Sequence, residues 1–163
     1  ASQSKADFKD MVPTIVKMPA IESYYIRNKG YNINIKETWQ KLQTWILTND
    51  IISYKRIALF HDNPTITPLN ECQYIGCVMV EDNQEVKSDR LPKFKIAEGV
   101  YAKFDLKGKT GDVLPFIHWV YHEWLPKNEY ETTTKPSYAI YNKIDFLDES
   151  NEFDLSFYVS INF

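Results

Sequence analysis

The order strand, helix, strand, strand occurs twice along this chain of 163 residues, and that duplication constrains the fold more than any other feature. The first set spans about residues 13–80 and the second residues 94–163, with a charged, polar stretch at 81–90 between them. Only the order and spacing of the elements repeat, not the residues themselves. Two such units place two helices against one or two antiparallel sheets. The sequence therefore predicts a single α+β domain with a cleft between its halves.

The first half begins with an alternating segment, TIVKMPAIESYYIR, which predicts a strand interrupted near Pro19 and a turn at Gly30. Asn34 and Glu37 have the spacing of a capping box, and the helix that they open is expected to run to about Asn49. One face of that helix is apolar at Ile35, Trp39, Leu42 and Ile46.

In the second half, residues 94–108 predict two extended pieces around Gly99. Thr110 is expected to cap a second helix and Pro126 to end it. The apolar stripe of that helix consists of Val113, Ile117, Val120 and Trp124. The remaining strands are expected at 56–60 and 72–80 in the first half, and at 136–142 and 152–162 in the second.

Charge and hydropathy argue against several classes of protein. The net charge is −3, and the densest basic stretch, RLPKFK at 90–95, reads equally well as a solvated strand edge, so no nucleic-acid surface is predicted. No apolar run approaches the roughly 18 residues that span a membrane. Residues 1–12 are polar and predict a tail, linker or tag remnant. Since no secretory leader opens the chain, the default expectation is a cytoplasmic location.

Cys72 and Cys77 lie five residues apart in an apparent strand. Their odd separation puts them on opposite faces, so they are not expected to form a disulfide with each other. We expect two small buried thiols in a reducing compartment.

The stretch FIHWVYHEWLP places His118 and His122 four residues apart, the spacing by which a helix presents two imidazoles to a metal ion. Helical phase sends both side chains away from the apolar stripe and toward solvent. Asp112 or His61 would have to supply a third ligand, and nothing in the sequence positions either. We therefore predict an exposed histidine pair and no metal site.

Aromatic residues make up 15% of the chain. Tyrosine and tryptophan carry a polar tip on an apolar body, which suits a binding surface, and an aromatic core is the equal alternative. The sequence contains no GxSxG, P-loop or GxGxxG motif and no Cys/His pair at a telling spacing. Neither a catalytic residue nor a cofactor is predicted.

Several segments together resemble the GyrI-like effector-binding family, the small-molecule module of gyrase-inhibitory proteins and of Rob- and BmrR-like transcription regulators. They occur in the family's order and spacing from about residue 13 onward, and the combination of HDNP.IT…C.Y..C, G.YA.F…G and WLP is fairly specific. The resembling segments are MPAIESYYIRNKGYN, the W…L..W helix at 39–45, LFHDNPTITPLNECQYIGCVMV, EGVYAKFDLKG, HEWLPKNEYE, KPSYAIY and DLSFYVSIN.

The resemblance implies a duplicated fold with a pocket between the halves that takes lipophilic, often cationic aromatic compounds. Aromatic faces attract a delocalised cation and bury its rings, and a carboxylate would supply the counter-charge. For each implied position, packing in the core without any ligand stays open as the alternative. For Glu123, the alternative is a position on a solvent-exposed flank of the helix. The implied ligand-binding residues are Tyr31, Trp39, Tyr101, Trp119, Glu123, Trp124, Tyr138 and Tyr141.

This chain departs from the family at Ala139, where members often carry the pocket glutamate. Cation recognition then depends on Glu22 or Glu123. The departure also weakens a hydrolase interpretation, because the hydrolytic branch of the family relies on an acidic residue at that position.

The leading interpretation is a small-molecule-binding module, either the effector-sensing part of a transcription regulator or a free-standing drug-binding protein, and not an enzyme. One alternative is a small-molecule hydrolase that uses the same cleft. Another is a gyrase-inhibitor-like protein that acts on a macromolecular partner. The chain carries no helix-turn-helix, so contact with DNA would require a further domain in the full-length protein.

Overall fold

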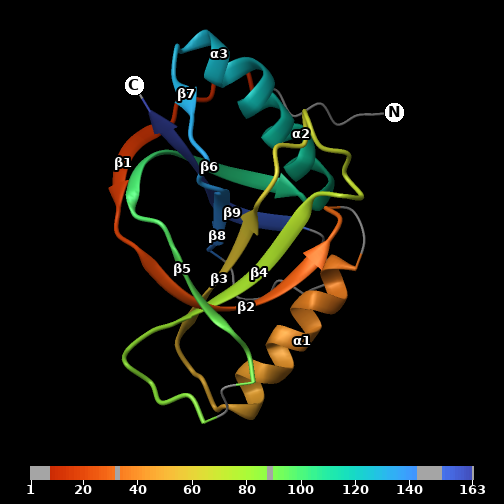
Figure 1. Cartoon of the computed structure of the whole chain (residues 1–163), viewed down its shortest axis with the longest axis vertical. Helices are drawn as coiled ribbons and strands as arrows, with labels where there is room; N and C mark the ends of the chain where they lie inside the picture. The colour runs from red at the N-terminus through yellow and green to blue at the C-terminus, as the bar shows by residue number, and fades with distance from the viewer. Residues whose placement is uncertain (1–7, 32–33, 88–89, 143–151, 163) are drawn as a thin grey trace.

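The computed structural model describes residues 8–31, 34–87, 90–142 and 152–162, which form a curled antiparallel sheet with helices on its outer face (Figure 1). Parts of the predicted tail (1–7) and of the polar stretch (88–89) lie outside the described residues. The strands are β1 (Thr14–Met18), β2 (Ile21–Lys29), β3 (Tyr54–Phe60), β4 (Gln73–Val80), β5 (Lys93–Ile96), β6 (Gly99–Lys109), β7 (Glu131–Thr132), β8 (Ser137–Tyr141) and β9 (Glu152–Asn162). The helical segments are α1 (Ile35–Thr48), the 3₁₀ turn η1 (Thr110–Asp112), α2 (Val113–Trp119), the π-helical turn η2 (Val120–Trp124) and α3 (Leu125–Lys127).

One path joins eight strands in the order β1-β6-β9-β8-β3-β4-β2-β5, and β7 pairs with β9. The two halves meet in the middle of this path, where β3 pairs with β8. The predicted α+β fold, with its repeated order of elements, is confirmed. Each half nevertheless gives its first strand to the other, since β1 pairs with β6 and β5 pairs with β2.

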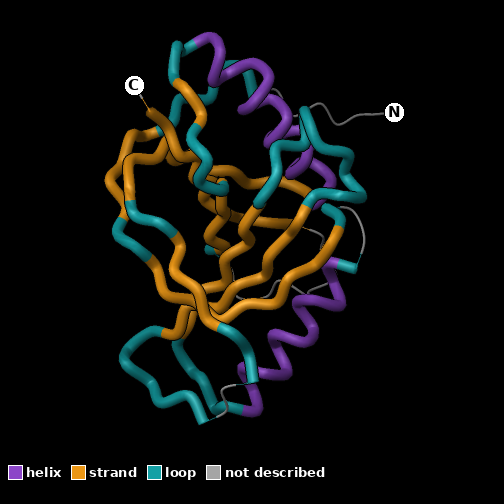
Figure 2. Tube along the Cα trace, viewed as in Figure 1, coloured by secondary structure: helices purple, strands orange, loops and turns teal. Residues whose placement is uncertain are grey.

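The exchanged strands form one continuous ladder that closes the sheet into a curl (Figure 2). Met18 pairs with Gly99 and, after a short bend in each strand, Ile21 pairs with Ile96. The register therefore runs unbroken from the β1–β6 pair into the β2–β5 pair, across the interruption that Pro19 predicts. This ladder joins the two ends of the strand path and encloses the space between them.

The inside of the curl is packed by side chains from the strands. Three tyrosines lie at its centre: the Tyr138 ring stacks on Tyr158 with centroids 4.8 Å apart and meets Tyr101 edge-on at 5.3 Å. The other buried members of this cluster are Ile21, Ile57, Leu59, Ile75, Cys77 and Ile96.

The outer face carries one helical segment on each half (Figure 1). Helix α1 lies on β2 and β4, and it approaches closely because Gly76 has no side chain to hold it off. On the second half, Phe116 of α2 meets Phe104 of β6 and Phe157 of β9, with ring centroids 5.5 and 5.4 Å apart. Each large apolar side chain buried in this way stabilises the fold by about 1.5–3 kcal/mol.

Helix α1 ends within a residue of its predicted end, but the predicted capping box is wrong. Asn34 adopts a left-handed conformation, with φ of 59°, and its side chain makes no cap hydrogen bond. Asparagine tolerates this conformation, so here it turns the chain into the helix. Its carbonyl oxygen instead accepts hydrogen bonds from the backbone N–H and the hydroxyl of Thr38.

The second helical segment departs from its prediction at both ends. Asp112, not Thr110, is the residue that precedes α2. Pro126 does not stop the helix, which continues through Lys127 as α3. The π-helical turn explains this: Leu125 N–H donates to the carbonyl of Val120, so a new first turn begins there, where proline's missing N–H costs little. None of the described helices is long and apolar enough to cross a bilayer.

The cysteines lie as predicted, buried on opposite faces of the sheet. Cys72 belongs to the cluster beneath the helices and Cys77 to the cluster inside the curl. The structure places Cys72 one residue before β4 instead of inside it.

Candidate functional site

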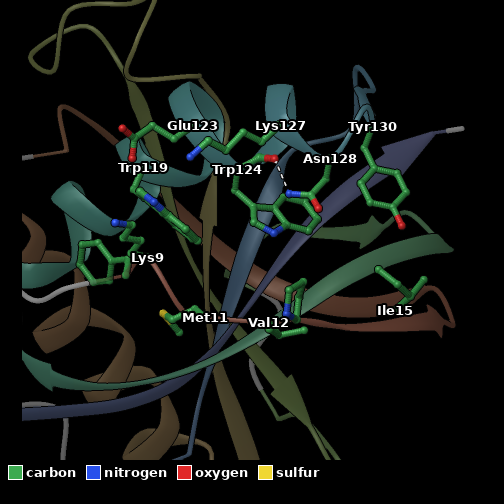
Figure 3. Close-up of a pocket in the computed structure, with 12 residues that line it drawn as sticks. Lys9, Met11, Val12, Ile15, Trp119, Glu123, Trp124, Lys127, Asn128 and Tyr130 are labelled. Atoms are coloured by element: carbon green, nitrogen blue, oxygen red, sulfur yellow. Dashed lines mark hydrogen bonds between the residues drawn. The ribbon is translucent and has the colours of Figure 1, made fainter.

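A cleft of about 660 Å³ lies between the second helical segment and the chain that leads into β1 (Figure 3). Three of the residues implied to bind ligand, Trp119, Glu123 and Trp124, line it together. The full lining is Phe8, Lys9, Met11, Val12, Pro13, Ile15, Trp119, Glu123, Trp124, Lys127, Asn128 and Tyr130.

Two indoles form the helical wall of the cleft. Trp119 is half-buried and Trp124 is buried, and the Trp124 ring stacks on Tyr130 with centroids 5.5 Å apart. Figure 3 shows Val12 and Ile15 across the gap from these rings, and both are exposed. The cleft therefore offers a slot with aromatic surface on one side and aliphatic surface on the other, which suits a flat apolar ligand.

The opposite wall comes from the segment that the sequence assigns to a polar tail. Phe8 packs edge-on against Phe116 at 5.4 Å between centroids, and lies 5.9 Å from the Trp119 ring. Met11 also packs against the core beneath the helices. Phe8 and Met11 thus cover aromatic surface that would otherwise face water, whereas Lys9, Asp10 and Val12 are exposed.

Charged side chains of both signs line the cleft. Glu123 is exposed, and Lys9 and Lys127 line the same cleft. Figure 3 places Glu123 and Lys127 close together on the outer rim, above the indoles. A carboxylate in contact with water is screened, so the Glu123 side chain attracts an opposite charge only weakly.

Three other implied residues lie in the core beneath α1 and not in the cleft. The Tyr31 hydroxyl donates to the carbonyl of Asp62 at 2.6 Å and accepts from its N–H at 2.8 Å. The Trp39 indole donates to the Tyr74 hydroxyl at 2.8 Å, and Tyr74 is hydrogen-bonded in turn to Tyr141. Burial raises the pKa of Tyr141 to about 12 and that of Tyr74 well above its ordinary value. These phenols stay neutral and brace the core.

Arg56 is a buried cation that the sequence analysis missed. Its guanidinium carbon lies 5.5 Å from the centroid of the Trp39 ring and 5.4 Å from that of Tyr141. The protein thus places its own cation over two of the aromatic rings implied to attract a ligand's charge. The only signal was an arginine at the start of the apolar strand RIALF, and such a residue usually marks a solvated strand end.

Ala139 lies at the seam between the halves, fully buried, where it pairs with Ala58 of β3 and Phe157 of β9. It faces the helices with the rest of that core cluster. A glutamate at this position would be a buried carboxylate on the same face of the sheet as Arg56. Because residue 139 is alanine, the charge in this part of the core comes from Arg56.

The last three implied residues lie elsewhere. Tyr101 and Tyr138 are buried inside the curl, on the opposite side of the sheet from Trp39 and Trp119. Tyr101 also lines a separate, smaller cavity. Glu22 is exposed on β2, opposite Lys95 of the edge strand β5, and lines neither cavity. Ligand binding by any of these residues stays a prediction.

The two histidines lie where helical phase predicts. His118 and His122 are both exposed, with ring centroids 5.3 Å apart. In the described part of the chain, no three His, Cys, Asp or Glu side chains are grouped so that they could hold a metal ion.

Comparison with known proteins identifies the family. The sequence model described as "GyrI-like small molecule binding domain" matches residues 11–161, nearly the whole chain. The chain belongs to the GyrI-like family. A DNA gyrase inhibitor of Citrobacter koseri is 24% identical to this GyrI-like domain over 129 residues, which are 78% of this chain and 82% of the relative.

Solved structures share the fold of this GyrI-like domain. The C-terminal domain of EcmrR superimposes with a TM-score of 0.68 at 15% identity, covering 94% of this chain and 98% of that one. In the complex of EcmrR with DNA, the matched region is 56% of the longer EcmrR chain. A structure described as a hydrolase from Listeria innocua has a TM-score of 0.62 at 10% identity, with 95% of each chain covered.

Proposed function

We propose that this GyrI-like domain binds a flat, lipophilic small molecule in the cleft between Trp119, Trp124 and the segment 8–15. The observation that supports the proposal is the cleft itself, whose volume of about 660 Å³ lies in the range of small-molecule sites and whose helical wall is made of indoles. Membership of a small-molecule-binding family supports the same conclusion.

The proposed ligand is neutral or weakly cationic. Glu123 supplies one negative charge at the rim, but it is exposed and shares the rim with Lys127. A screened carboxylate of this kind contributes about 0–1 kcal/mol, so it biases selection toward cations by only a few fold. Burial of aromatic surface against Trp119 and Trp124 supplies most of the affinity.

A fluorescence titration tests the proposal. We expect a cationic rhodamine and a neutral dye of similar size, such as Nile red, both to quench the tryptophan emission saturably. Trp119→Ala should weaken both dyes at least tenfold, whereas Trp45→Phe, which removes a buried indole of α1, should leave both affinities unchanged. Glu123→Gln should lower only the ratio of rhodamine to Nile red affinity. Equal effects of the Trp119 and Trp45 variants would refute the site.

The physiological role that we propose is effector sensing in a transcription regulator. The support is the similarity to the EcmrR C-terminal domain, which belongs to a longer chain solved in complex with DNA. Contact with DNA would come from another domain, because the net charge of this chain is −3. We also propose a cytoplasmic location, which the two free buried thiols support.

Two other functions have a specific observation in their favour. Similarity to a DNA gyrase inhibitor suggests action on that enzyme, and a supercoiling assay with purified gyrase, with and without the domain, tests it. Similarity to a structure described as a hydrolase suggests turnover of the bound compound. Mass spectrometry of the dye after prolonged incubation distinguishes a hydrolase from a binding module, since a binding module leaves the compound unchanged.

A further inference from the structure

A second cavity, of about 300 Å³, opens into the inside of the curl, on the face of the sheet away from the helices. It is separate from the cleft at Trp119, because the two linings have no residue in common. Its lining is Tyr25, Arg27, Leu59, His61, Ile75, Phe94, Lys95, Ile96, Ala97, Tyr101 and Pro136.

The walls of this cavity are apolar and aromatic. Tyr25 and Phe94 meet edge-on with centroids 4.8 Å apart and flank the opening, while Leu59 and Ile75 are buried at its base. The Tyr101 hydroxyl donates to the carbonyl of Ala97 at 2.6 Å, which fixes the ring as a wall. At about 300 Å³ the cavity lies at the lower end of ligand-site volumes, which suits a single ring.

The charge at the mouth is positive. The residues that line the cavity include Arg27 and Lys95 and no aspartate or glutamate. Arg27 shares the inner face of β2 with Tyr25 and is opposite Ile75, whereas the alternation of β5 directs the Lys95 side chain to the other face. Arg27 is therefore the cation that a ligand in this cavity would meet.

The guanidinium of Arg27 is hydrogen-bonded to the side chain of Gln73, whose own backbone is bound to Asp62. Its Nη1 donates to Oε1 of Gln73 at 3.0 Å, and the backbone N–H of Gln73 donates to Oδ2 of Asp62 at 2.6 Å. A guanidinium has five N–H donors, so the bond to Gln73 leaves capacity for a second acceptor. Planar, bidentate contact with a carboxylate is the interaction for which this group is best shaped.

A buried polar residue, Tyr138, adjoins the Tyr101 wall of this cavity without lining it. Tyr138 packs against Tyr101, and its buried hydroxyl has no hydrogen-bond partner among the described residues. A buried hydroxyl without a partner destabilises a fold, and native proteins usually satisfy such a group with water or a ligand.

We propose that this cavity is a second binding site, selective for a compact aromatic monocarboxylate. The ring lies between Tyr25, Phe94 and Tyr101, and the carboxylate accepts hydrogen bonds from Arg27 at the mouth. The selectivity is opposite in sign to the cation preference that the family resemblance implies, and it does not depend on the cleft at Trp119.

Three probes that share one ring and differ in charge test the proposal: phenylacetate, phenylacetamide and 2-phenylethylammonium. In titrations of ¹⁵N-labelled protein, phenylacetate should shift the backbone amides of Ile75 and Ile96 saturably. We expect phenylacetamide to bind at least tenfold more weakly and 2-phenylethylammonium to produce no saturable shift at these amides.

Arg27→Gln should weaken phenylacetate at least tenfold and leave phenylacetamide within twofold. Lys29→Gln is the matched control, since it removes the same charge from an exposed position on the same face of β2. It should leave phenylacetate within twofold. Equal binding of the three probes, equal loss in both variants, or phenylacetate shifts confined to the Trp119 and Trp124 indoles would each overturn the proposal. The dispersion of the Arg27→Gln amide spectrum reports whether this exposed-site variant is folded.

Discussion

Burial determines the chemistry of Cys77 on the inner face of β4. It raises the pKa of the thiol from its ordinary 9.0 to about 12, so the folded protein keeps this proton where the unfolded chain loses it. The contribution of this pKa difference to the free energy of unfolding is fully present below pH 9 and is lost as the pH rises toward 12. By pH 10 the loss is about 1 kcal/mol.

Comparison of the wild type with Cys77→Ala isolates this effect, because all other titrating groups are shared. We expect the difference in free energy of unfolding between the two proteins to shrink by about 1 kcal/mol from pH 8 to pH 10. Urea unfolding at each pH, in the presence of a reductant, measures it. Parallel stability curves for the two proteins would show that the thiol is not protected in the fold.

Single residues show which features of the structure can be predicted from the sequence and which cannot. The exposure of His118 and His122 follows from helical phase, and the opposite faces of the two cysteines follow from strand alternation. Whether a tyrosine lines a cavity or braces a core is not encoded in its neighbours in the sequence. The family resemblance implies the same pocket for Tyr31 and Trp119. In the structure the Tyr31 hydroxyl is hydrogen-bonded to the backbone of Asp62, whereas Trp119 lines the cleft.

At the scale of elements, the contact of α1 with the sheet depends on Gly76. A Cβ atom there would lie 2.8 Å from Cδ1 of Leu42 and 3.1 Å from Cγ2 of Thr38. Gly76→Ala must therefore displace the Leu42 side chain or α1 itself, and we expect a loss of about 1–3 kcal/mol. Gly111→Ala is the control, because a Cβ at Gly111 meets no described atom within 4 Å. Urea unfolding checks both, and equal stabilities would contradict this account of the packing.

The helices themselves were predictable because apolar residues at spacings of three and four mark one face over several turns. Their ends were less predictable. Asn34 caps by its carbonyl and its left-handed backbone instead of its side chain, and Pro126 is accommodated because the π-helical turn before it restarts the helix. Both outcomes depend on hydrogen bonds between residues whose geometry the side-chain pattern does not specify.

At the scale of the whole molecule, the duplication was visible in the sequence but the exchange of first strands was not. Order and spacing are the same whether β1 pairs within its own half or with β6 of the other half. The pairing is selected by the fold as a whole, since the continuous ladder from β1–β6 into β2–β5 encloses apolar side chains from both halves. The halves are therefore interlocked, and neither contains a complete core.

This interlocking predicts how the protein responds to a break in the chain. With a site-specific protease sequence inserted after Glu85, in the polar stretch between the halves, cleavage should leave the two pieces associated. They share the exchanged strands, the β3–β8 pairing and both core clusters, so the contact between them resembles a domain core cut in half. We expect a single peak at the uncut elution volume in size-exclusion chromatography and an unchanged circular dichroism spectrum. After separation in urea, each piece alone should be largely unfolded, and mixing on dilution should restore the native spectrum. Pieces that separate without denaturant, or that fold alone, would show that the halves are independent units.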